Sequence, residues 1–415
     1  MNSETPVPGL PEKTGGPPGR TRTDPCHSCH VCDEVCPVAP VNADFPGPSA
    51  QGPREWRLRR GGVSVDPSIA ACSNCLQCHA ACPADVDLMA LHTDARAEHV
   101  AERTGRHALR DRLLANYGLL ARLGSRVPRL ANWAMDNDWL RSLAESLLGI
   151  TAERPAPEFA SRTFREWWDE RGGPQVESET RRVAYFHGDH ANYHRPEVGR
   201  ALVRVYEHLG YEVRVPDQRC SGAPMVANGH LEDAKRVTSA NVESFRPYLE
   251  AGYDVVATCT SCSLTLRETN PREFDVDGVE RLSEHTDDAV AYLRKRGELA
   301  ELELDPEALP DAVSYHAPCH AREQGVDGTA LPALEEAGVA VTHLGGECSG
   351  MSGTYGWKAE RYEDSMAIGE SLFEAAESAE AAASLTECPT CGMQLEHGTE
   401  ETATHPIEVL AAGLD

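Results

Sequence analysis

The chain has 415 residues, of which 66 are Asp or Glu and 39 are Lys or Arg, so its formal net charge is −27. A chain this acidic lacks the broad basic surface that nucleic-acid binding needs. Its length predicts two or three domains. It has only four lysines, and an acidic composition with arginine in place of lysine favours a halophilic source over an ordinary acidic cytosolic protein, because salt screens the self-repulsion of the surface.

Residues 1–23 are polar and rich in proline and glycine, and we expect them to form a disordered tail. They contain no apolar core of the kind that a signal peptide needs. The chain also has no run of 18 or more apolar residues, so no transmembrane helix is predicted. We therefore expect a cytoplasmic protein whose fifteen cysteines serve metal binding or catalysis rather than disulfides.

Two cysteine runs follow within residues 24–100, and each has the spacing C-x2-C-x2-C-x3-C-P. The spacing is typical of ferredoxins that hold two 4Fe–4S clusters, in which three thiolates of a run bind one cluster and the fourth binds the other. We therefore predict a helical ferredoxin domain at 24–100 and disfavour zinc or disulfides. The hypothesis assigns one cluster to Cys26, Cys29, Cys32 and Cys82, and the other to Cys72, Cys75, Cys78 and Cys36.

Residues 101–178 predict a helical connector and linker. Residues 101–150 are the one basic part of the chain, with a net charge of +3, and their arginines and leucines recur at helical spacing on both sides of Pro128. A basic segment that also carries Trp133 and Trp139 suits an anionic membrane surface. We favour instead the interpretation that its apolar stripe packs on the ferredoxin fold or on a partner, because two glycines and the proline interrupt it.

The rest of the chain is an internal repeat, with one copy at 179–305 and a second at 306–415. Each copy has a strand-like segment, a helical stretch, a Cys-Ser-Gly sequence and a further strand that ends in Cys-x-x-Cys. Alternating strands and helices at this scale predict a duplicated, layered α/β fold. The expected fold class is thus a multidomain protein, with an α-helical two-cluster ferredoxin domain followed by two α/β cysteine-rich domains.

The two copies differ in their candidate ligands. The second has four thiols, enough for a 4Fe–4S cluster or a closed zinc site: Cys319, Cys348, Cys388 and Cys391. The first has Cys220, Cys259 and Cys262, with Asp189 in the place of the fourth thiol, and is either a weaker metal site or an emptied relic. Histidines flank the first ligand position of each copy, at 187 and 190 and at 316 and 320. Metal binding or proton transfer would suit them, but we favour ordinary hydrogen-bonded loop histidines.

Several stretches carry a resemblance to a known family: VPDQRCSGAPMVANG, YHAPCH, CSGMSGTYGWKAERYEDSMAIGESLF and the terminal HPIEVLAAGL. From about residue 24 to the end, the chain resembles the C subunits of anaerobic glycerol-3-phosphate dehydrogenases. The duplicated cysteine-rich unit is also similar to those of heterodisulfide reductase B subunits and of lactate- and glycolate-oxidising complexes.

The resemblance implies an electron-transfer subunit rather than a catalytic one. It implies a flavoprotein partner that oxidises glycerol 3-phosphate, a B subunit, and delivery of electrons to quinone at the inner face of the cell membrane. It also implies two 4Fe–4S clusters and a further one in the second repeat. The sequence has no G-x-G-x-x-G dinucleotide signature and no phosphate-binding loop of its own.

The chain departs from the family pattern in one respect, because the relatives usually have Cys-Cys-Gly where this chain has Cys220-Ser221-Gly222 and Cys348-Ser349-Gly350. The missing thiols argue against the non-cubane clusters of heterodisulfide reductases. The two serines either donate hydrogen bonds to cluster sulfurs or are neutral replacements, and we favour the second. The alternatives in function are an iron–sulfur subunit of a lactate or glycolate oxidase complex, and a stand-alone electron carrier.

Overall fold

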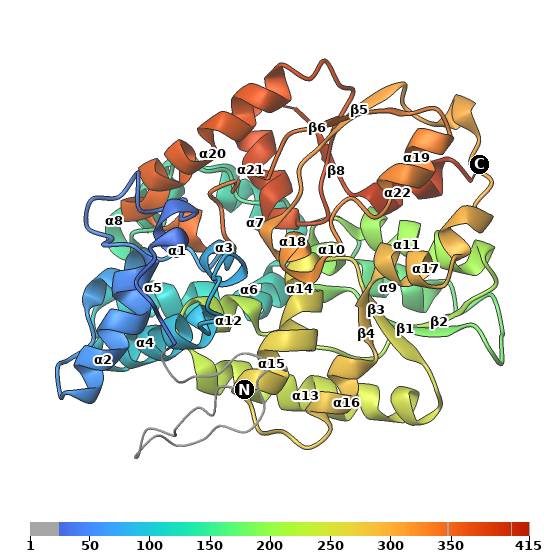
Figure 1. Cartoon of the computed structure of the whole chain (residues 1–415). Helices are drawn as coiled ribbons and strands as arrows, with labels where there is room; N and C mark the ends of the chain where they lie inside the picture. Colours follow the sequence, from blue (N-terminus) through green and yellow to red (C-terminus); the bar gives the residue numbers. More distant parts are fainter. Residues whose placement is uncertain (1–24, 347, 400, 415) are drawn as a thin grey trace.

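The computed structural model of the chain describes residues 25–346, 348–399 and 401–414. The tail expected at 1–23 lies outside these residues. The described chain forms a helical N-terminal unit, a helical connector and two α/β units (Figure 1). This order confirms the expected fold class.

The N-terminal unit consists of short helices around the cysteine runs and one longer helix after them. Helices α1 (Val31–Glu34) and α3 (Gln77–Ala80) lie at equivalent places in the two runs. Between the runs lie η1 (Ala50–Arg54), α2 (Glu55–Arg60) and η2 (Pro67–Ala71). Helix α4 (Leu88–Glu102) begins where the Asp87 side chain accepts a hydrogen bond from the Ala90 amide. Since most of the first half of α4 is buried, it anchors the second cysteine run.

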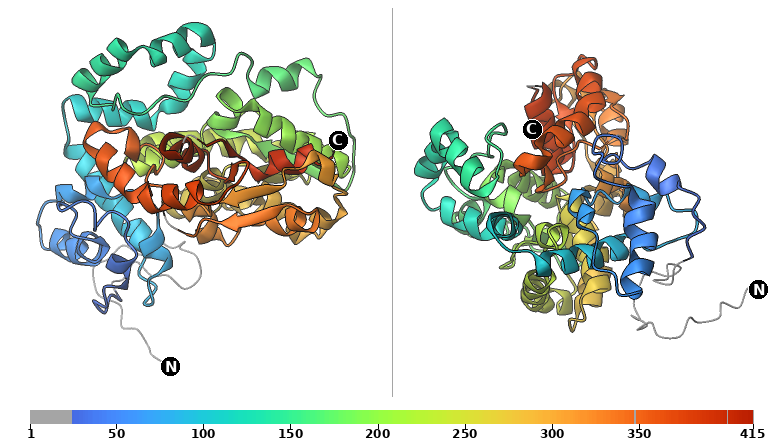
Figure 2. Two further views of the ribbon diagram at one scale, coloured as in Figure 1. Left: turned by 90° about the horizontal axis from the view of Figure 1, so that it is seen from above. Right: turned by 90° about the vertical axis from the view of Figure 1, so that its left-hand side faces the viewer.

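The connector comprises α5 (Arg106–Ala115), α6 (Tyr117–Gly124), α7 (Pro128–Asp136) and α8 (Asp138–Leu148). Proline at the first position of α7 suits a helix start, because its φ is preset and its missing N–H has no intrahelical partner there. Figure 2 shows these helices as a lobe at one side of the α/β units. Helix α9 (Phe164–Glu170), which begins with a capping box of Thr163 and Glu166, then joins the lobe to the first α/β unit.

Many of the large apolar side chains of the connector are exposed to solvent. Ten of the twelve exposed large hydrophobic residues in the described chain lie in it: Leu109, Leu119, Leu120, Leu123, Val127, Leu130, Trp133, Trp139, Leu143 and Leu147. We call these ten residues the exposed apolar surface. The expectation that this stripe packs on the ferredoxin fold is therefore wrong, while packing on a partner stays a prediction. Among the described residues, no helix has both the length and the apolar character that crossing a membrane requires.

The two α/β units have the same topology. In the first, β1 (Arg182–Phe186), β2 (Glu212–Arg214), β3 (Asp254–Ala257) and β4 (Thr286–Asp288) form a parallel sheet in the order β2-β1-β3-β4. In the second, β5 (Ala312–Tyr315), β6 (Ala340–His343), β7 (Ser384–Leu385) and β8 (Ala403–Thr404) form one in the order β6-β5-β7-β8. The matching order confirms the predicted duplication.

Helices cover the sheets of both units, which explains why the central strands are mostly apolar. The first unit has α10 (Gly188–Tyr193), α11 (Pro196–His208), α12 (Ala223–Ala227), α13 (Leu231–Glu250), α14 (Thr260–Leu264), η3 (Thr265–Thr269), α15 (Asn270–Glu273), α16 (Val279–Glu284) and α17 (Ala289–Lys295). Short turns η4 (Glu298–Glu301) and η5 (Pro306–Ala308) lead to the second unit. That unit has α18 (Cys319–Gln324), α19 (Leu331–Glu336), η6 (Tyr355–Trp357), η7 (Ala359–Arg361), α20 (Tyr362–Glu377), α21 (Pro389–Thr399) and α22 (Pro406–Ala412).

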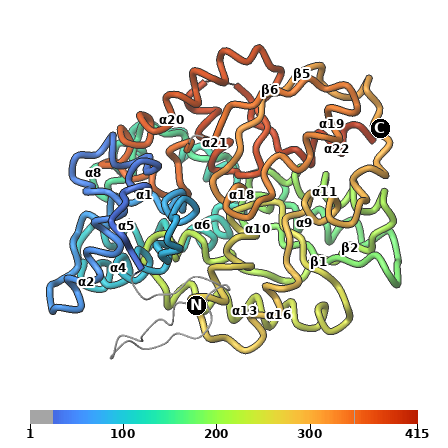
Figure 3. The backbone as a smooth tube through the Cα atoms, viewed as in Figure 1, coloured from blue at the N-terminus to red at the C-terminus, as the bar shows by residue number. Residues whose placement is uncertain are grey.

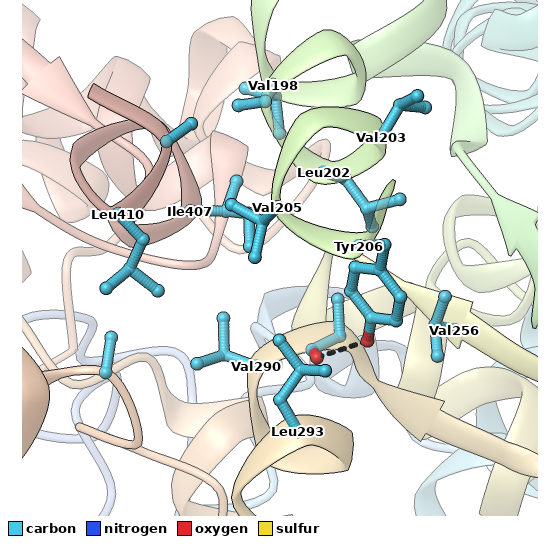
Figure 4. Close-up of a cluster of buried hydrophobic side chains, with 14 of the residues drawn as sticks. Val198, Leu202, Val203, Val205, Tyr206, Val256, Val290, Leu293, Ile407 and Leu410 are labelled. Atoms are coloured by element: carbon cyan, nitrogen blue, oxygen red, sulfur yellow. Dashed lines mark hydrogen bonds between the residues drawn. The ribbon is translucent and has the colours of Figure 1, made fainter. Parts of the chain in front are cut away.

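The two α/β units share one hydrophobic core. Helix α11 of the first unit packs against α22 of the second, and Leu202, Val205, Ile407 and Leu410 are fully buried there (Figure 4). The Tyr206 hydroxyl, inside the same core, donates a hydrogen bond of 2.6 Å to the carbonyl oxygen of Ala289. The trace in Figure 3 shows a second long-range contact, since the N-terminal unit lies beside α20 of the second α/β unit.

Candidate metal centres

The first set of predicted ligands surrounds one cavity in the N-terminal unit. Cys26, Cys29 and Cys32 of the first run line it together with Cys82 of the second run. Cys29 is exposed, and the other three are partly buried. The amide of Ser28 donates to the Cys26 sulfur at 3.4 Å, the kind of contact that stabilises a thiolate. The crossed grouping in the hypothesis is thus the grouping that the fold produces.

The second set surrounds a neighbouring cavity, lined by Cys72, Cys75 and Cys78 with Cys36 from the first run. Cys36, Cys75 and Cys78 are buried and Cys72 is partly buried, so this set lies deeper than the first. Burial opposes ionisation of Cys72, but the adjacent Arg96 guanidinium and His92 outweigh it and lower the pKa of this thiol to about 6. Arg96 also donates to the Cys72 carbonyl at 3.1 Å, which fixes its position.

The two cysteine runs share an unusual backbone conformation. The residues before and after each middle cysteine are left-handed: Ser28 and His30 around Cys29, and Asn74 and Leu76 around Cys75, with φ between 54° and 65°. Such values are rare for residues other than glycine. They allow the loop to curl so that three thiols of a run point to one centre. A site that holds one multi-iron group per run fits this geometry.

The four thiols of the second α/β unit also converge. Cys319 begins α18, Cys348 precedes the loop to η6, and Cys388 and Cys391 flank the start of α21. Cys391 donates to the Cys388 sulfur, and this hydrogen bond is the main reason why the pKa of Cys388 falls to about 5. Burial and the negative charges of Cys75 and Cys388 raise the pKa of Cys319.

Polar atoms around this set point to a bound group. The Ser349 hydroxyl donates to the Cys391 sulfur at 3.3 Å, and the Gly350 amide donates to Cys348 at 3.4 Å. These contacts favour the hydrogen-bonding interpretation of Ser349 over neutral replacement. His316 is 1% exposed, and neither of its ring nitrogens has a partner among the described residues, so the expectation of an ordinary hydrogen-bonded histidine is wrong for it. An orphaned buried imidazole and four buried or half-buried thiols fit a cluster in this place.

The first α/β unit also brings its candidate residues together, and there they hydrogen-bond one another in pairs. Cys220 donates a hydrogen bond to Asp189, and Cys262 donates one to Cys259. Burial raises the pKa of Asp189 to about 6, because the hydrogen bond from Cys220 offsets only part of the desolvation. Gly118 of α6 covers this carboxyl so closely that a Cβ there would lie 2.3 Å from Oδ2. His187 hydrogen-bonds the Gly188 carbonyl at 2.7 Å and is an ordinary loop histidine.

A direct contact joins the N-terminal unit to the second α/β unit. Cys348 donates a hydrogen bond to the Cys75 sulfur, and both side chains lie in one buried cluster with Cys36. Residues more than 270 positions apart thus place the deeper ferredoxin set against the four thiols of the second unit. Among the described residues, no three His, Cys, Asp or Glu side chains are grouped as ligands of a single metal ion.

Sequence reasoning missed the residues that surround the thiols. Arg96 and His92 lie on α4, far along the chain from the motif centre, and the sequence has no spacing signal for them. His320 was named as a flanking residue, but its partners, Ser261 of the first α/β unit and the Asn74 carbonyl of the cysteine run, come from the fold alone.

Comparison with known proteins agrees with this geometry. Residues 22–86 match the family described as "4Fe-4S dicluster domain", and residues 183–267 and 313–396 match "Cysteine-rich domain". The chain is 35% identical to the C subunit of anaerobic glycerol-3-phosphate dehydrogenase of Escherichia coli, over 95% of its own length and 99% of that protein. The chain belongs to this family of C subunits.

More distant relatives share parts of the arrangement. The B subunit of fumarate reductase (CoM/CoB) of Methanothermobacter marburgensis is 26% identical over 93% of this chain and 70% of that protein. "Lactate utilization protein A" of an Exiguobacterium species is 31% identical over 39% of this chain and 68% of that protein. This member of the C-subunit family is an iron–sulfur electron-transfer subunit of an oxidoreductase, with 4Fe–4S clusters as cofactors. The sequence resemblance to the family is thereby confirmed, while a halophilic source stays a prediction.

Proposed function

We propose that this chain carries electrons from a flavoprotein that oxidises glycerol 3-phosphate to the membrane quinone pool. The observation that carries the proposal is the packing of Cys75 against Cys348 in one buried cluster, which joins the ferredoxin sets to the second α/β unit. The match to the C subunit along nearly the whole chain supports glycerol 3-phosphate as the substrate of the partner. A flavoprotein and a B subunit are the proposed partners.

The proposed ligands are those that the fold groups together. Cys26, Cys29, Cys32 and Cys82 would hold the outer cluster, and Cys36, Cys72, Cys75 and Cys78 the deeper one. Cys319, Cys348, Cys388 and Cys391 would hold a third 4Fe–4S cluster. Bound clusters supply one-electron carriers whose potentials depend on nearby charge and hydrogen bonds. The protein buries all of these thiols except Cys29, wholly or in part, and donates hydrogen bonds to several of their sulfurs.

The proposed order of electron transfer follows from how exposed each cysteine set is. The outer set includes the exposed Cys29, where a partner can approach, whereas the deeper set contacts the second α/β unit. Electrons would therefore enter at the outer set and leave from the second α/β unit. The set in the first α/β unit remains a weaker metal candidate: Asp189, Cys220, Cys259 and Cys262. Two of its groups, the Asp189 carboxyl and the Cys220 thiol, already hydrogen-bond each other.

We further propose that the exposed apolar surface docks the complex on the inner face of the cell membrane. Its leucines and tryptophans lie on helices that also carry arginines, among them Arg122 and Arg129, and Arg126 lies in the turn between α6 and α7. Apolar burial in the interface and attraction to anionic lipid headgroups would act together there.

Iron and sulfide analysis of anaerobically purified protein tests the cluster assignment. We expect about 12 iron atoms per chain, and about 8 in a Cys388→Ser variant whose ferredoxin EPR signals are unchanged. A value of about 8 in the unmodified chain, or zinc in the second α/β unit, would refute the third cluster.

The substrate is tested by anaerobic reduction of the purified complex. Glycerol 3-phosphate should reduce the EPR-visible clusters, whereas lactate and glycolate should not. Recovery of the chain without any flavoprotein, or cluster reduction by lactate alone, would refute the proposed function.

A further inference from the structure

A cavity with a volume of about 620 Å³ lies between the two α/β units and the linker that follows the connector. The first unit contributes Asp189 and Cys259, the second contributes Thr386 and Cys388, and the linker contributes residues 155–158. Sites for small organic ligands have volumes of this order and often lie between domains. Most of the residues that line it are not among the predicted ligands.

We propose that this cavity binds the headgroup of a quinone and is the place where electrons leave the chain. This assignment rests on the proposed function and gives its electron acceptor a site. Three features support it: the thiols in the cavity wall, a wall hydroxyl without a hydrogen-bond partner among the described residues, and the exposed apolar surface next to the cavity.

The first feature is the position of the thiols. Cys388 belongs to the four-thiol set of the second α/β unit and also lines the cavity. Another thiol of that set, Cys348, contacts Cys75 of the ferredoxin unit. The cavity is therefore at the end of the row of cysteine sets that is opposite to the exposed Cys29. An acceptor in it would be next to the last carrier.

The second feature is the polarity of the wall. Thr386 is only 4% exposed, and its hydroxyl has no hydrogen-bond partner among the described residues, although it lines the cavity. His194 and His405, on the same wall, already hydrogen-bond the carbonyls of Glu158 and Thr258. Val198, Met393 and three prolines add apolar area. A flat, largely apolar ligand that presents a carbonyl oxygen to Thr386 matches this wall.

The third feature is the neighbouring exposed apolar surface. The Asn132 side chain, on α7, exchanges two hydrogen bonds of 2.8 and 3.0 Å with the backbone of Phe159, immediately after the cavity-lining segment. Tyr117 of α6 hydrogen-bonds His194 inside the wall. The helices that carry the apolar surface thus adjoin the cavity. A ligand that resides in a lipid bilayer would meet the cavity where the chain meets the lipid.

The proposed reduction of the quinone balances in electrons and protons without any covalent bond to the protein. One quinone accepts two electrons, delivered singly from the clusters that the flavoprotein has reduced, and takes up two protons from water. The product is the quinol, and the clusters return to their oxidised state.

The test compares two variants in the linker of the full complex. Ala156→Trp places an indole in the cavity wall, whereas Ala160→Trp puts the same side chain in the same linker outside the cavity lining. Binding of 2-methyl-1,4-naphthoquinone to the oxidised complex is measured by calorimetry. We expect Ala156→Trp to raise Kd at least about tenfold and Ala160→Trp to leave it unchanged.

A second variant tests the hydroxyl. Thr386→Val keeps the shape of the side chain and removes one hydrogen bond, so we expect Kd and KM for the quinone to rise about fivefold with unchanged cluster EPR spectra. Reduction of ferricyanide by glycerol 3-phosphate should be unchanged in all three variants. Wild-type affinity in both Ala156→Trp and Thr386→Val would overturn the cavity assignment alone.

Two further outcomes separate this proposal from the proposed function. A wild-type complex that reduces ferricyanide but neither binds nor reduces the quinone would refute both. An iron content of about 16 atoms per chain would place a cluster among Cys220, Cys259 and Cys262, against the cavity, and would overturn the acceptor site while leaving electron transfer intact.

Discussion

Ser349 places its hydroxyl 3.3 Å from the Cys391 sulfur, in a position where relatives usually have a second cysteine. In the proposed third cluster, a hydrogen bond to a ligand sulfur would stabilise the reduced, more negative state, so the hydroxyl of Ser349 would tune the site. At Cys72, burial raises the pKa of the thiol, but the charge of Arg96 and the hydrogen bond and charge of His92 together lower it. Single polar groups next to the sulfurs therefore add to the differences in thiol number and burial between the cysteine sets.

Ser349→Ala should lower the reduction potential of the site in the second α/β unit. The lost hydrogen bond corresponds to about 1 kcal/mol, or roughly 40 mV for a one-electron carrier. Redox titration followed by EPR measures the shift, with the exposed Ser239→Ala as the control. An unchanged potential would mean that the hydroxyl does not contact the cluster-bound sulfur.

At the scale of elements, the connector is held to the second α/β unit by buried charges although its apolar side chains remain outside. Arg110 of α5 makes two hydrogen bonds, of 2.6 and 2.7 Å, to Glu360, and Lys358 lies 3.2 Å from Asp111. Burial lowers the pKa of Lys358 to about 8 despite that carboxylate. Ion pairs thus fix the orientation of the lobe and leave its apolar side free.

The depressed pKa of Lys358 predicts a pH dependence of stability. Between pH 8 and about 10.4, the unfolded chain binds a proton that the folded chain has lost, so the free energy of unfolding rises with pH in this window. Lys358→Met should remove this rise, because Asp111 keeps Arg103 and Arg110 as partners. Thermal unfolding as a function of pH measures it, with the exposed Lys295→Met as the control. Equal slopes in both variants would contradict the assignment.

The exposed apolar surface predicts lipid binding. Replacing Leu119, Trp133 and Trp139 by serine should abolish sedimentation of the complex with vesicles that contain anionic phospholipid, without loss of stability, because these side chains are 59–69% exposed. Leu58→Ser with Val63→Ser is the matched control, since these residues are exposed hydrophobics outside the surface. Sedimentation of the triple variant at the wild-type level would exclude this surface as the docking site.

For the whole molecule, the shared core makes the two α/β units one cooperative structure. Leu410 on the last helix packs into the same cluster as Leu202 of the first unit. Stability is therefore distributed across the boundary that the repeat suggests.

Leu410→Ala should lower the free energy of unfolding by about 2–5 kcal/mol, since it removes a fully buried side chain. Unfolding should remain a single transition when followed by circular dichroism and by tryptophan fluorescence, to which Trp168, packed on the first unit, contributes. Leu147→Ala, on the exposed apolar surface, should change little. Two separate transitions would show that the units unfold independently.

Features that depend on local spacing could be predicted from the sequence. The repeat, the alternation of strands and helices within each copy and the crossed grouping of Cys82 with Cys26 all follow patterns that local motifs impose. The outward orientation of the connector was not predicted, because helical periodicity shows that a face is apolar but not what covers it. The Cys75–Cys348 contact and the cavity at Asp189 depend on how distant units pack, which motif spacing does not encode.

The graded burial of the cysteine sets has a consequence for oxidative damage. Cys29 is exposed, whereas Cys75, Cys78, Cys348 and Cys388 are buried. Dissolved oxygen and peroxide therefore reach the outer set first, since sulfur oxidation follows accessibility. Oxidation would begin at the set where electrons enter the chain, and it would stop electron transfer before the buried sets are oxidised. A protein damaged in this way would stop delivering electrons while its inner sites stayed intact, and repair would need to rebuild only the outermost site.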